Sequence, residues 1–127
     1  MNNHYENKYA VYQIRDYILY ITYKKGLILN YAAARQIVHD RLSLQSYESY
    51  PVICNVSEVK NIDFEARGYL SIYGSILITI VALLSNNKTI YSMGRFYIEV
   101  NSPKVPTQIF NNLEEAEIFI TTVIKIL

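Results

Sequence analysis

The sequence predicts a single α/β domain in which helices cover a mixed sheet. Residues 51–56 and 78–84 are short, β-branched apolar runs, which are typical of strands buried on both faces. Between them, residues 66–77 carry apolar side chains at steps of three and four, the spacing of a helix packed on a sheet. Strand, crossover helix and strand form a βαβ unit, and its connection is expected to be right-handed.

The residues before this unit predict a hairpin and a helix. Residues 9–14 and 17–23 are Tyr-rich apolar runs separated by the polar pair Arg15-Asp16, which fits two antiparallel strands. Residues 1–8 are expected to be a flexible lead-in, so the domain would cover residues 9–127.

Asn30 can cap the first helix, which has one predicted apolar stripe. The residues of that stripe are Ala34, Ile37, Val38 and Leu42. The residues expected to face water are Arg35, Gln36, His39, Asp40 and Ser43. Arg41 interrupts the stripe, and we expect its long side chain to reach solvent from the last turn.

In the central unit, Asp63 stands at the N-cap of the crossover helix, where its carboxylate can accept free N–H groups of the first turn. The predicted apolar residues of that helix are Ala66, Tyr69, Leu70, Tyr73, Ile76 and Leu77. The residues predicted on its opposite side are Arg67, Gly68, Ser71 and Ser75.

Two more helices and one strand follow. Residues 85–87 can cap a third helix, and its predicted buried face consists of Ile90, Met93, Gly94, Tyr97 and Val100. Gly94 on that face indicates a close approach of helix to sheet. Residues 107–110 predict a short strand, and Asn112 with Glu115 resembles a capping box before the last helix. The predicted order is therefore β-β-α-β-α-β-α-β-α, with an antiparallel first strand and parallel later strands.

Composition limits the function classes. The chain has 127 residues, of which 51% are hydrophobic, enough for one buried core. A formal net charge of +1 gives no electrostatic case for binding nucleic acid or an anionic membrane. The single cysteine, Cys54, allows no intramolecular disulfide and has no partner at metal-ligand spacing, so we expect no metal, no cofactor and a cytoplasmic location.

Residues 68–87 contain no formal charge over a length that could span a membrane. This segment also carries Tyr, Ser, Thr, Gly and Asn, and no basic cluster brackets it. A helix end followed by a buried strand is therefore favoured over a membrane span.

No catalytic constellation stands out. Cys54 is expected to be buried in a strand, whereas His39 lies on the predicted solvent face of its helix and His4 lies in the lead-in. Asp63 with Glu58 or Glu65 could form a carboxylate pair, but nothing in the sequence places them in one cleft. The protein is expected not to be an enzyme, and an enzyme of unknown type remains a trailing alternative.

The order of elements and residues 52–67 resemble the STAS domain (SpoIIAA-like), the fold of bacterial anti-sigma-factor antagonists and of the cytosolic tails of sulfate transporters. Residues 80–84 and 104–110 are similar to small stand-alone bacterial STAS-like proteins of unassigned function. In the STAS family, a Ser or Thr just after the Asp that opens the second helix is phosphorylated by a partner kinase. Here Phe64 and Glu65 follow Asp63, so the resemblance implies a partner-binding platform without its phosphate switch. Glu65 could replace that charge, although complementing the helix dipole is its simpler role.

Two functional hypotheses remain open. The first is a non-catalytic regulatory module that docks a protein partner, because recognition concentrates at the carboxyl ends of parallel strands. Its candidate residues are Ser57, Asp63, Phe64, Glu65 and Arg67. The second is a binder of a small apolar or lipid-like ligand, with Tyr69, Tyr73 and Phe96 around a pocket. A homodimer formed through an edge strand at residues 17–23 is a further expectation.

Overall fold

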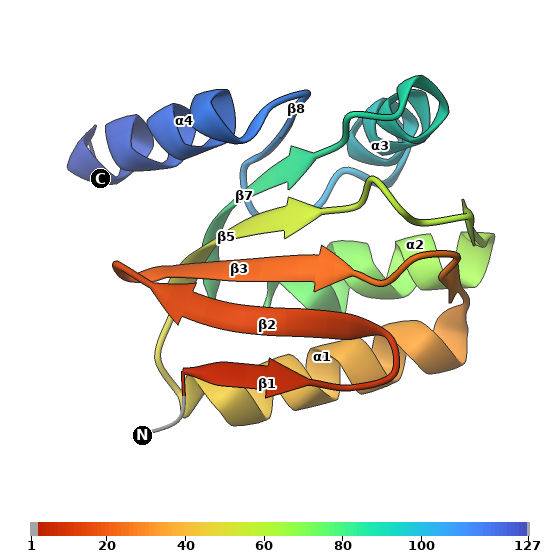
Figure 1. The fold of residues 1–127 in the computed structure, drawn as a ribbon, viewed down its shortest axis with the longest axis horizontal. Helices are drawn as coiled ribbons and strands as arrows, with labels where there is room; N and C mark the ends of the chain where they lie inside the picture. Colours follow the sequence, from red (N-terminus) through yellow and green to blue (C-terminus); the bar gives the residue numbers. More distant parts are fainter. Residues whose placement is uncertain (1–2, 127) are drawn as a thin grey trace.

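Six strands form one mixed sheet, in the order β1-β2-β3-β5-β7-β8, in the computed structural model of the chain (Figure 1). The structure describes residues 3–126. The antiparallel part of the sheet consists of β1 (His4–Glu6), β2 (Ala10–Arg15) and β3 (Ile18–Tyr23). The parallel part continues from β3 through β5 (Tyr50–Asn55), β7 (Ile78–Leu84) and β8 (Thr107–Phe110). The predicted fold class is confirmed.

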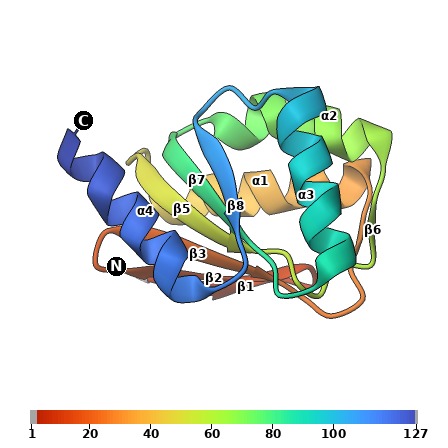
Figure 2. The same ribbon diagram turned by 90° about the horizontal axis from the view of Figure 1, so that it is seen from above.

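Helices cover both faces of this sheet (Figures 1 and 2). On one face lie α1 (Tyr31–Gln45), α2 (Phe64–Ile72), the short 3₁₀ helix η1 (Tyr73–Ser75) and α3 (Lys88–Asn101). The other face carries α4 (Leu113–Ile126). A separate parallel pair, β4 (Ile28–Leu29) and β6 (Asn61–Ile62), joins the segments that lead into α1 and α2.

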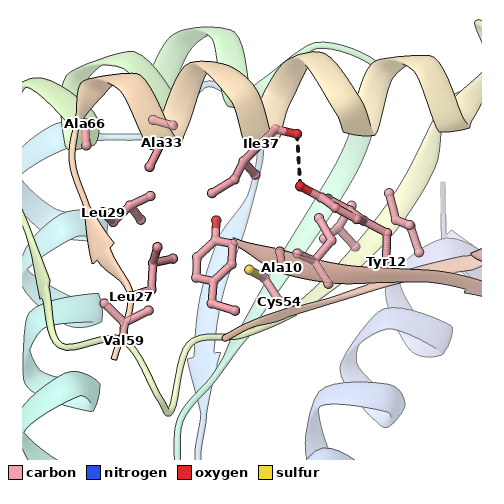
Figure 3. Close-up of a cluster of buried hydrophobic side chains, with 14 of the residues drawn as sticks. Ala10, Tyr12, Leu27, Leu29, Ala33, Ile37, Cys54, Val59 and Ala66 are labelled. Carbon is pink, nitrogen blue, oxygen red and sulfur yellow. Dashed lines mark hydrogen bonds between the residues drawn. The ribbon is translucent and has the colours of Figure 1, made fainter. Parts of the chain in front are cut away.

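The larger core lies between the sheet and α1 and α2. Figure 3 shows part of it, with Leu27 and Val59 at one end and Tyr12 at the other. The Tyr12 hydroxyl donates a hydrogen bond of 3.4 Å to the carbonyl oxygen of Ile37, so its polar end is satisfied inside the core.

The smaller core lies between the sheet and α4, and its buried members are Ile18, Ile53, Ile80, Ala82, Ala116 and Ile120. Val81 packs against the larger core while its neighbour Ala82 belongs to the smaller one. This alternation explains why residues 78–84 form a continuous apolar run, since both faces of β7 are covered.

The hairpin turn is shifted by one residue from the predicted pair Arg15-Asp16. Arg15 pairs with Ile18, which leaves Asp16 and Tyr17 as a two-residue loop with φ values of 50° and 64°. Both positive values match the turn type whose twist suits an antiparallel hairpin, although the positions hold no Gly or Asn.

Two predictions about the N-terminal strands are wrong. Residues 4–6 of the predicted lead-in form β1, which pairs with β2. The strand predicted as a free edge lies inside the sheet, because β3 pairs with β2 on one side and with β5 on the other. Residues 17–23 therefore offer no free edge for a homodimer, and self-association stays a prediction without that route.

The crossover helix is shorter than predicted. It ends at Ile72 and continues as η1, so Leu77, with a φ of 58°, lies outside it. Ser71, predicted to face outward, is buried, and its carbonyl oxygen accepts the N–H of Lys104 at 3.0 Å, which holds the segment before β8 against this part of α2. Its hydroxyl donates to Gly68 O at 2.8 Å. No helix within residues 3–126 is long and apolar enough to cross a membrane.

Two residues expected to reach water from α1 are buried instead. Asp40 is held by the turn before β2, and Arg41 is only 2% exposed beneath η1. On α3, Val100 is exposed rather than buried, because this helix packs along β8 at the edge of the sheet. The predicted close approach at Gly94 is confirmed, since a Cβ there would lie 2.5 Å from Ile109 Cδ1.

Candidate functional site

The predicted docking residues lie at the start of α2, where the parallel strands end. Asp63 caps this helix, as predicted, and its Oδ1 accepts the N–H of Ala66 at 2.8 Å. Ser57 follows β5, and its hydroxyl accepts the N–H of Asn86 at 3.1 Å, which joins the loops after β5 and β7. Glu65 is exposed in the first turn of α2. Asp63 and Ser57 thus hold the backbone in place, while Glu65 is open to solvent.

Two exposed phenylalanine rings lie close to one guanidinium. Arg67 Cζ lies 5.8 Å from the ring centroid of Phe64 and 5.1 Å from that of Phe96. Phe64 begins α2 and is 77% exposed, whereas Phe96 lies in α3 and is 49% exposed. Arg67 Nε also donates to Asn101 Oδ1 at 3.3 Å. We call Phe64, Arg67 and Phe96 the aromatic–arginine surface.

An open groove of about 410 Å³ runs beside this surface. Its lining residues are Ile62, Arg67, Thr89, Ser92, Met93 and Phe96. Phe96, predicted for a ligand pocket, therefore belongs to the exposed groove between α2 and α3. The structure brings it together with Phe64 and Arg67, which the helical spacing of α2 alone could not show.

The other two residues predicted for a pocket stack on each other. The ring centroids of Tyr69 and Tyr73 are 4.8 Å apart, and Tyr31 of α1 meets Tyr69 edge-on at 5.5 Å. These rings join α1 to α2 and do not line the cavity described below.

A second cavity, of about 120 Å³, lies between the sheet and the three helices α1, α2 and α3 and shares Ile62 and Met93 with the groove. Its apolar walls include Ile37, Val52, Leu70, Val81 and Met93. The polar side chains that line it are Tyr23, Arg41, Cys54, Ser75, Tyr97 and Thr107. Sequence reasoning missed this cavity, although the interruption of an apolar stripe by Arg41 was a signal for it.

Arg41 is the charged residue of this cavity. Its Nη1 donates to Gln45 Oε1 and, at 2.9 Å, to the carbonyl oxygen of Ile76, and its Nη2 donates to Gly74 O at 3.4 Å. Burial lowers the pKa of Arg41 to about 10. The ion pairs found in residues 3–126 join other side chains, so no carboxylate of that region compensates this cation.

Cys54 lies in β5 against the same cavity. Burial raises the pKa of its thiol to about 12, so the thiol stays protonated at neutral pH. His39, in contrast, lies at the surface of α1 and contacts the carboxylate of Asp40 at 3.2 Å. A protonated thiol in a strand is a poor nucleophile, which disfavours a Cys-His dyad. The part of the chain described here contains no group of three His, Cys, Asp or Glu side chains that could hold a metal ion.

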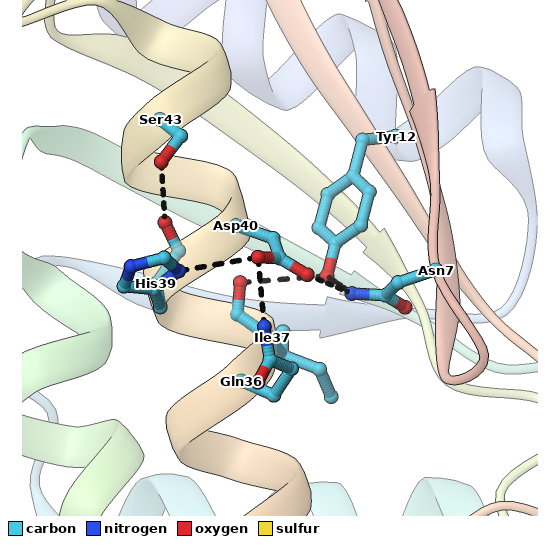
Figure 4. Close-up of polar contacts among 7 residues, drawn as sticks. All are labelled: Asn7, Tyr12, Gln36, Ile37, His39, Asp40 and Ser43. Atoms are coloured by element: carbon cyan, nitrogen blue, oxygen red, sulfur yellow. Dashed lines mark hydrogen bonds and ion pairs between the residues drawn. The ribbon is translucent and has the colours of Figure 1, made fainter.

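Asp40 of α1 forms a polar cluster with the turn between β1 and β2, away from the contact of Arg41 with η1 (Figure 4). Its carboxylate accepts hydrogen bonds from Asn7 Nδ2 at 2.8 Å and from Gln36 Nε2 at 2.9 Å. Burial pushes the pKa of Asp40 upward, but hydrogen bonds from Asn7, His39 and Gln36 outweigh it and keep the pKa below its ordinary value. Asn7 also accepts the N–H groups of Tyr9 and Ala10 through Oδ1, so this cluster fixes the β1–β2 turn to α1.

Comparison with known proteins identifies the fold and a family. The chain is similar to an uncharacterized protein of the DUF3478 family from Shewanella loihica PV-4, whose crystal structure has a SpoIIAA-like fold. The two align with a TM-score of 0.63 and 13% identity over 94% of this chain and 97% of the other. This likeness confirms the predicted STAS-like fold and carries no function.

A comparison with curated proteins gives no match. The model of one family, described as Domain of unknown function (DUF7793), matches residues 12–124, which is most of the chain. The protein therefore belongs to the DUF7793 family.

Proposed function

We propose that this protein is a non-catalytic regulatory module that docks a protein partner on the aromatic–arginine surface. The observation that carries the proposal is the placement of two exposed phenylalanine rings close to Arg67 at the carboxyl ends of the parallel strands. Aromatic residues and arginine are enriched in protein interfaces and dominate their binding energy. The role belongs in the cytoplasm, where a lone cysteine such as Cys54 stays reduced.

The surface favours a partner with an acidic side chain flanked by apolar ones. An acidic group could pair with Arg67, while apolar groups could fill the groove beside Met93 and cover the ring of Phe64. The positions after Asp63 hold no hydroxyl, so docking would not be released by phosphorylation there. Glu65 keeps a carboxylate beside the surface, and we expect it to disfavour partners that are acidic throughout.

The test is capture of partners from native cells with the tagged wild-type protein and a Phe64→Ala, Phe96→Ala double variant. Loss of a hot-spot ring raises the dissociation constant by about 30-fold, so the double variant should lose the captured partner. Ile118→Ala is the matched control, because it removes an exposed apolar side chain from α4. Circular dichroism checks that all variants fold. A partner that the double variant retains would contradict docking at this surface.

A second candidate function, the binding of a small apolar ligand, is favoured by the cavity of about 120 Å³. A cavity of this size is far larger than one water molecule requires, and it is lined mostly by apolar side chains. The residues that support it are those of the cavity wall rather than Tyr69, Tyr73 and Phe96. Denaturing extraction of protein from its native cells, followed by mass spectrometry, should release a stoichiometric small molecule. An extract without one would count against this candidate.

A further inference from the structure

The cavity contains a buried cation that forms no ion pair with any side chain of residues 3–126. Arg41 is 2% exposed and its recorded hydrogen-bond acceptors are one side-chain amide and two backbone carbonyls. These acceptors are neutral, so they satisfy N–H groups without cancelling the charge. Buried charges are normally paired with an opposite charge, because removing an ion from water costs several kcal/mol.

Among the described residues, the side chains around Arg41 supply no negative charge. Asp40 is adjacent in the chain, but its carboxylate is turned toward Asn7, Gln36 and His39. The groups that counteract the effect of burial on the pKa of Arg41 are Tyr23, Tyr12, Cys54 and Tyr69. Burial raises the pKa of the Cys54 thiol to about 12 and raises that of Tyr23 well above its ordinary value, so both are neutral at pH 7. An anion would have to come from outside the described residues.

The position of Arg41 suits the headgroup of a ligand. Its hydrogen bonds to Gly74 and Ile76 place the guanidinium next to η1. Partly exposed members of the cavity wall include Gly74 and Ser75 of η1 and Pro103 and Val105 before β8, beside others on α2, β7 and α3. The fully buried members, which include Val52 and Cys54, lie deeper against the sheet. A ligand entering beside η1 would meet the cation first and apolar walls beyond it.

We infer that the cavity binds a short aliphatic monocarboxylate, with its carboxylate at Arg41 and its chain among the apolar walls. Guanidinium and carboxylate form strong, directional hydrogen bonds, and these strengthen in a site shielded from water. A cavity of about 120 Å³ suits a chain of about six carbons, since an apolar cavity of about 150 Å³ admits benzene. This inference rests on the second candidate function and is independent of the aromatic–arginine surface.

The experiment compares three probes that share one chain length and differ in charge: hexanoate, hexan-1-ol and hexylammonium. Binding to the ¹⁵N-labelled protein is followed by chemical-shift changes of the amides of residues in the cavity wall. We expect hexanoate to bind at least tenfold more tightly than hexan-1-ol, and hexylammonium not to bind. Equal affinity for hexanoate and hexan-1-ol would overturn the anion inference and leave the apolar-ligand function standing. Failure of all three probes to bind would overturn both.

Variants of Arg41 test whether this residue causes the preference for hexanoate over hexan-1-ol. Arg41→Met should bring the affinities for hexanoate and hexan-1-ol within about twofold of each other, because it keeps the side-chain length without the charge. Arg41→Lys keeps the charge, so it should retain preference for hexanoate and tests the inference even if Arg41→Met does not fold. Arg95→Met is the matched control, since it removes an exposed arginine from α3.

A further variant tests the place of binding. Val105→Phe puts a larger side chain on the partly exposed segment before β8 and should weaken binding of hexanoate and hexan-1-ol alike. Unchanged binding of hexanoate to both Val105→Phe and Arg41→Met would show that it binds elsewhere on the protein and would overturn the inference.

Discussion

The two faces of the sheet differ in what they bury. Beneath α4, the buried members of the smaller core are Ile and Ala side chains, and the hydroxyl of Tyr20, which packs against them, donates to Glu117 Oε2 of α4 at 2.6 Å. On the other face, α1 and α2 bury the polar residues Asp40, Arg41, Gln45 and Ser71, and a cavity of about 120 Å³ lies between α1, α2, α3 and the sheet. The same strands serve both faces, because their residues alternate between them.

The difference indicates that the α4 face serves mainly stability, whereas the α1–α3 face has room to bind a ligand. An apolar cluster contributes stability in proportion to the surface that it removes from water. A face that keeps a cavity and a buried cation gives up part of that stability, since cavity walls lack contacts and buried charges are costly. We therefore expect ligand chemistry on the α1–α3 face and chiefly stability from the α4 face.

The largest expected effect comes from truncating the packed face. Ile120→Ala should lower the free energy of unfolding by about 2 to 5 kcal/mol, because Ile120 is fully buried in the smaller core. Ile90→Ala removes a similar side chain from the cavity wall, so its cost should fall at the lower end of that range. Urea denaturation measures both. A larger loss for Ile90→Ala than for Ile120→Ala would contradict the difference between the faces.

The second prediction adds volume to neighbouring residues of β7. Ala82→Val should destabilise the protein by about 1 to 3 kcal/mol, because Ala82 is fully buried against α4. Val81→Ile points its extra methylene toward the cavity and should change stability by less than about 0.5 kcal/mol or increase it. Thermal unfolding of the two variants gives the comparison. Equal destabilisation would mean that the cavity has no spare room at Val81.

The third prediction concerns pH. Because the pKa of Asp40 is lowered in the folded protein, its ionised form contributes stability above the pKa of an unfolded Asp, about 4, and this contribution is lost as pH falls through the folded value. Asp40→Asn should cost about 1 to 2 kcal/mol at pH 7, with the difference from wild type shrinking below pH 4. Glu114→Gln on α4 is the control, and its effect should stay small. A deficit for Asp40→Asn that is the same at pH 3 and pH 7 would exclude a role for the ionised carboxylate.

The smallest expected effects come from the helix caps. Asp63 caps α2 on the face that holds the cavity. Asn112 caps α4 on the other face, where its Oδ1 accepts the N–H of Glu115 at 2.8 Å. Replacing either residue with Ala should cost about 1 kcal/mol, because capping is a local interaction. Equal values from chemical denaturation would show that the two faces differ in packing rather than in their helix ends. A much larger cost for Asp63→Ala would assign it a second structural role.

Part of the candidate site could be predicted from sequence. Asp63, Phe64 and Arg67 follow a buried strand within a few residues, so their place at the carboxyl end of the sheet follows from chain order. Phe96 could not be placed beside them, because its neighbours depend on how α3 crosses α2. Arg41 was noticed as an exception to an apolar stripe, but its burial depends on η1, which lies more than thirty residues later in the chain.

The sequence by itself determined the order of the main elements, the boundaries of β7 and the caps at Asn30, Asp63 and Asn112, because each depends on side chains within about four residues of one another. Only the tertiary structure decided that β1 joins the sheet, that β3 lies inside it, and that Asp40 and Arg41 are buried. Those outcomes depend on contacts between distant segments, and the periodicity of one helix or strand carries no information about what packs against it.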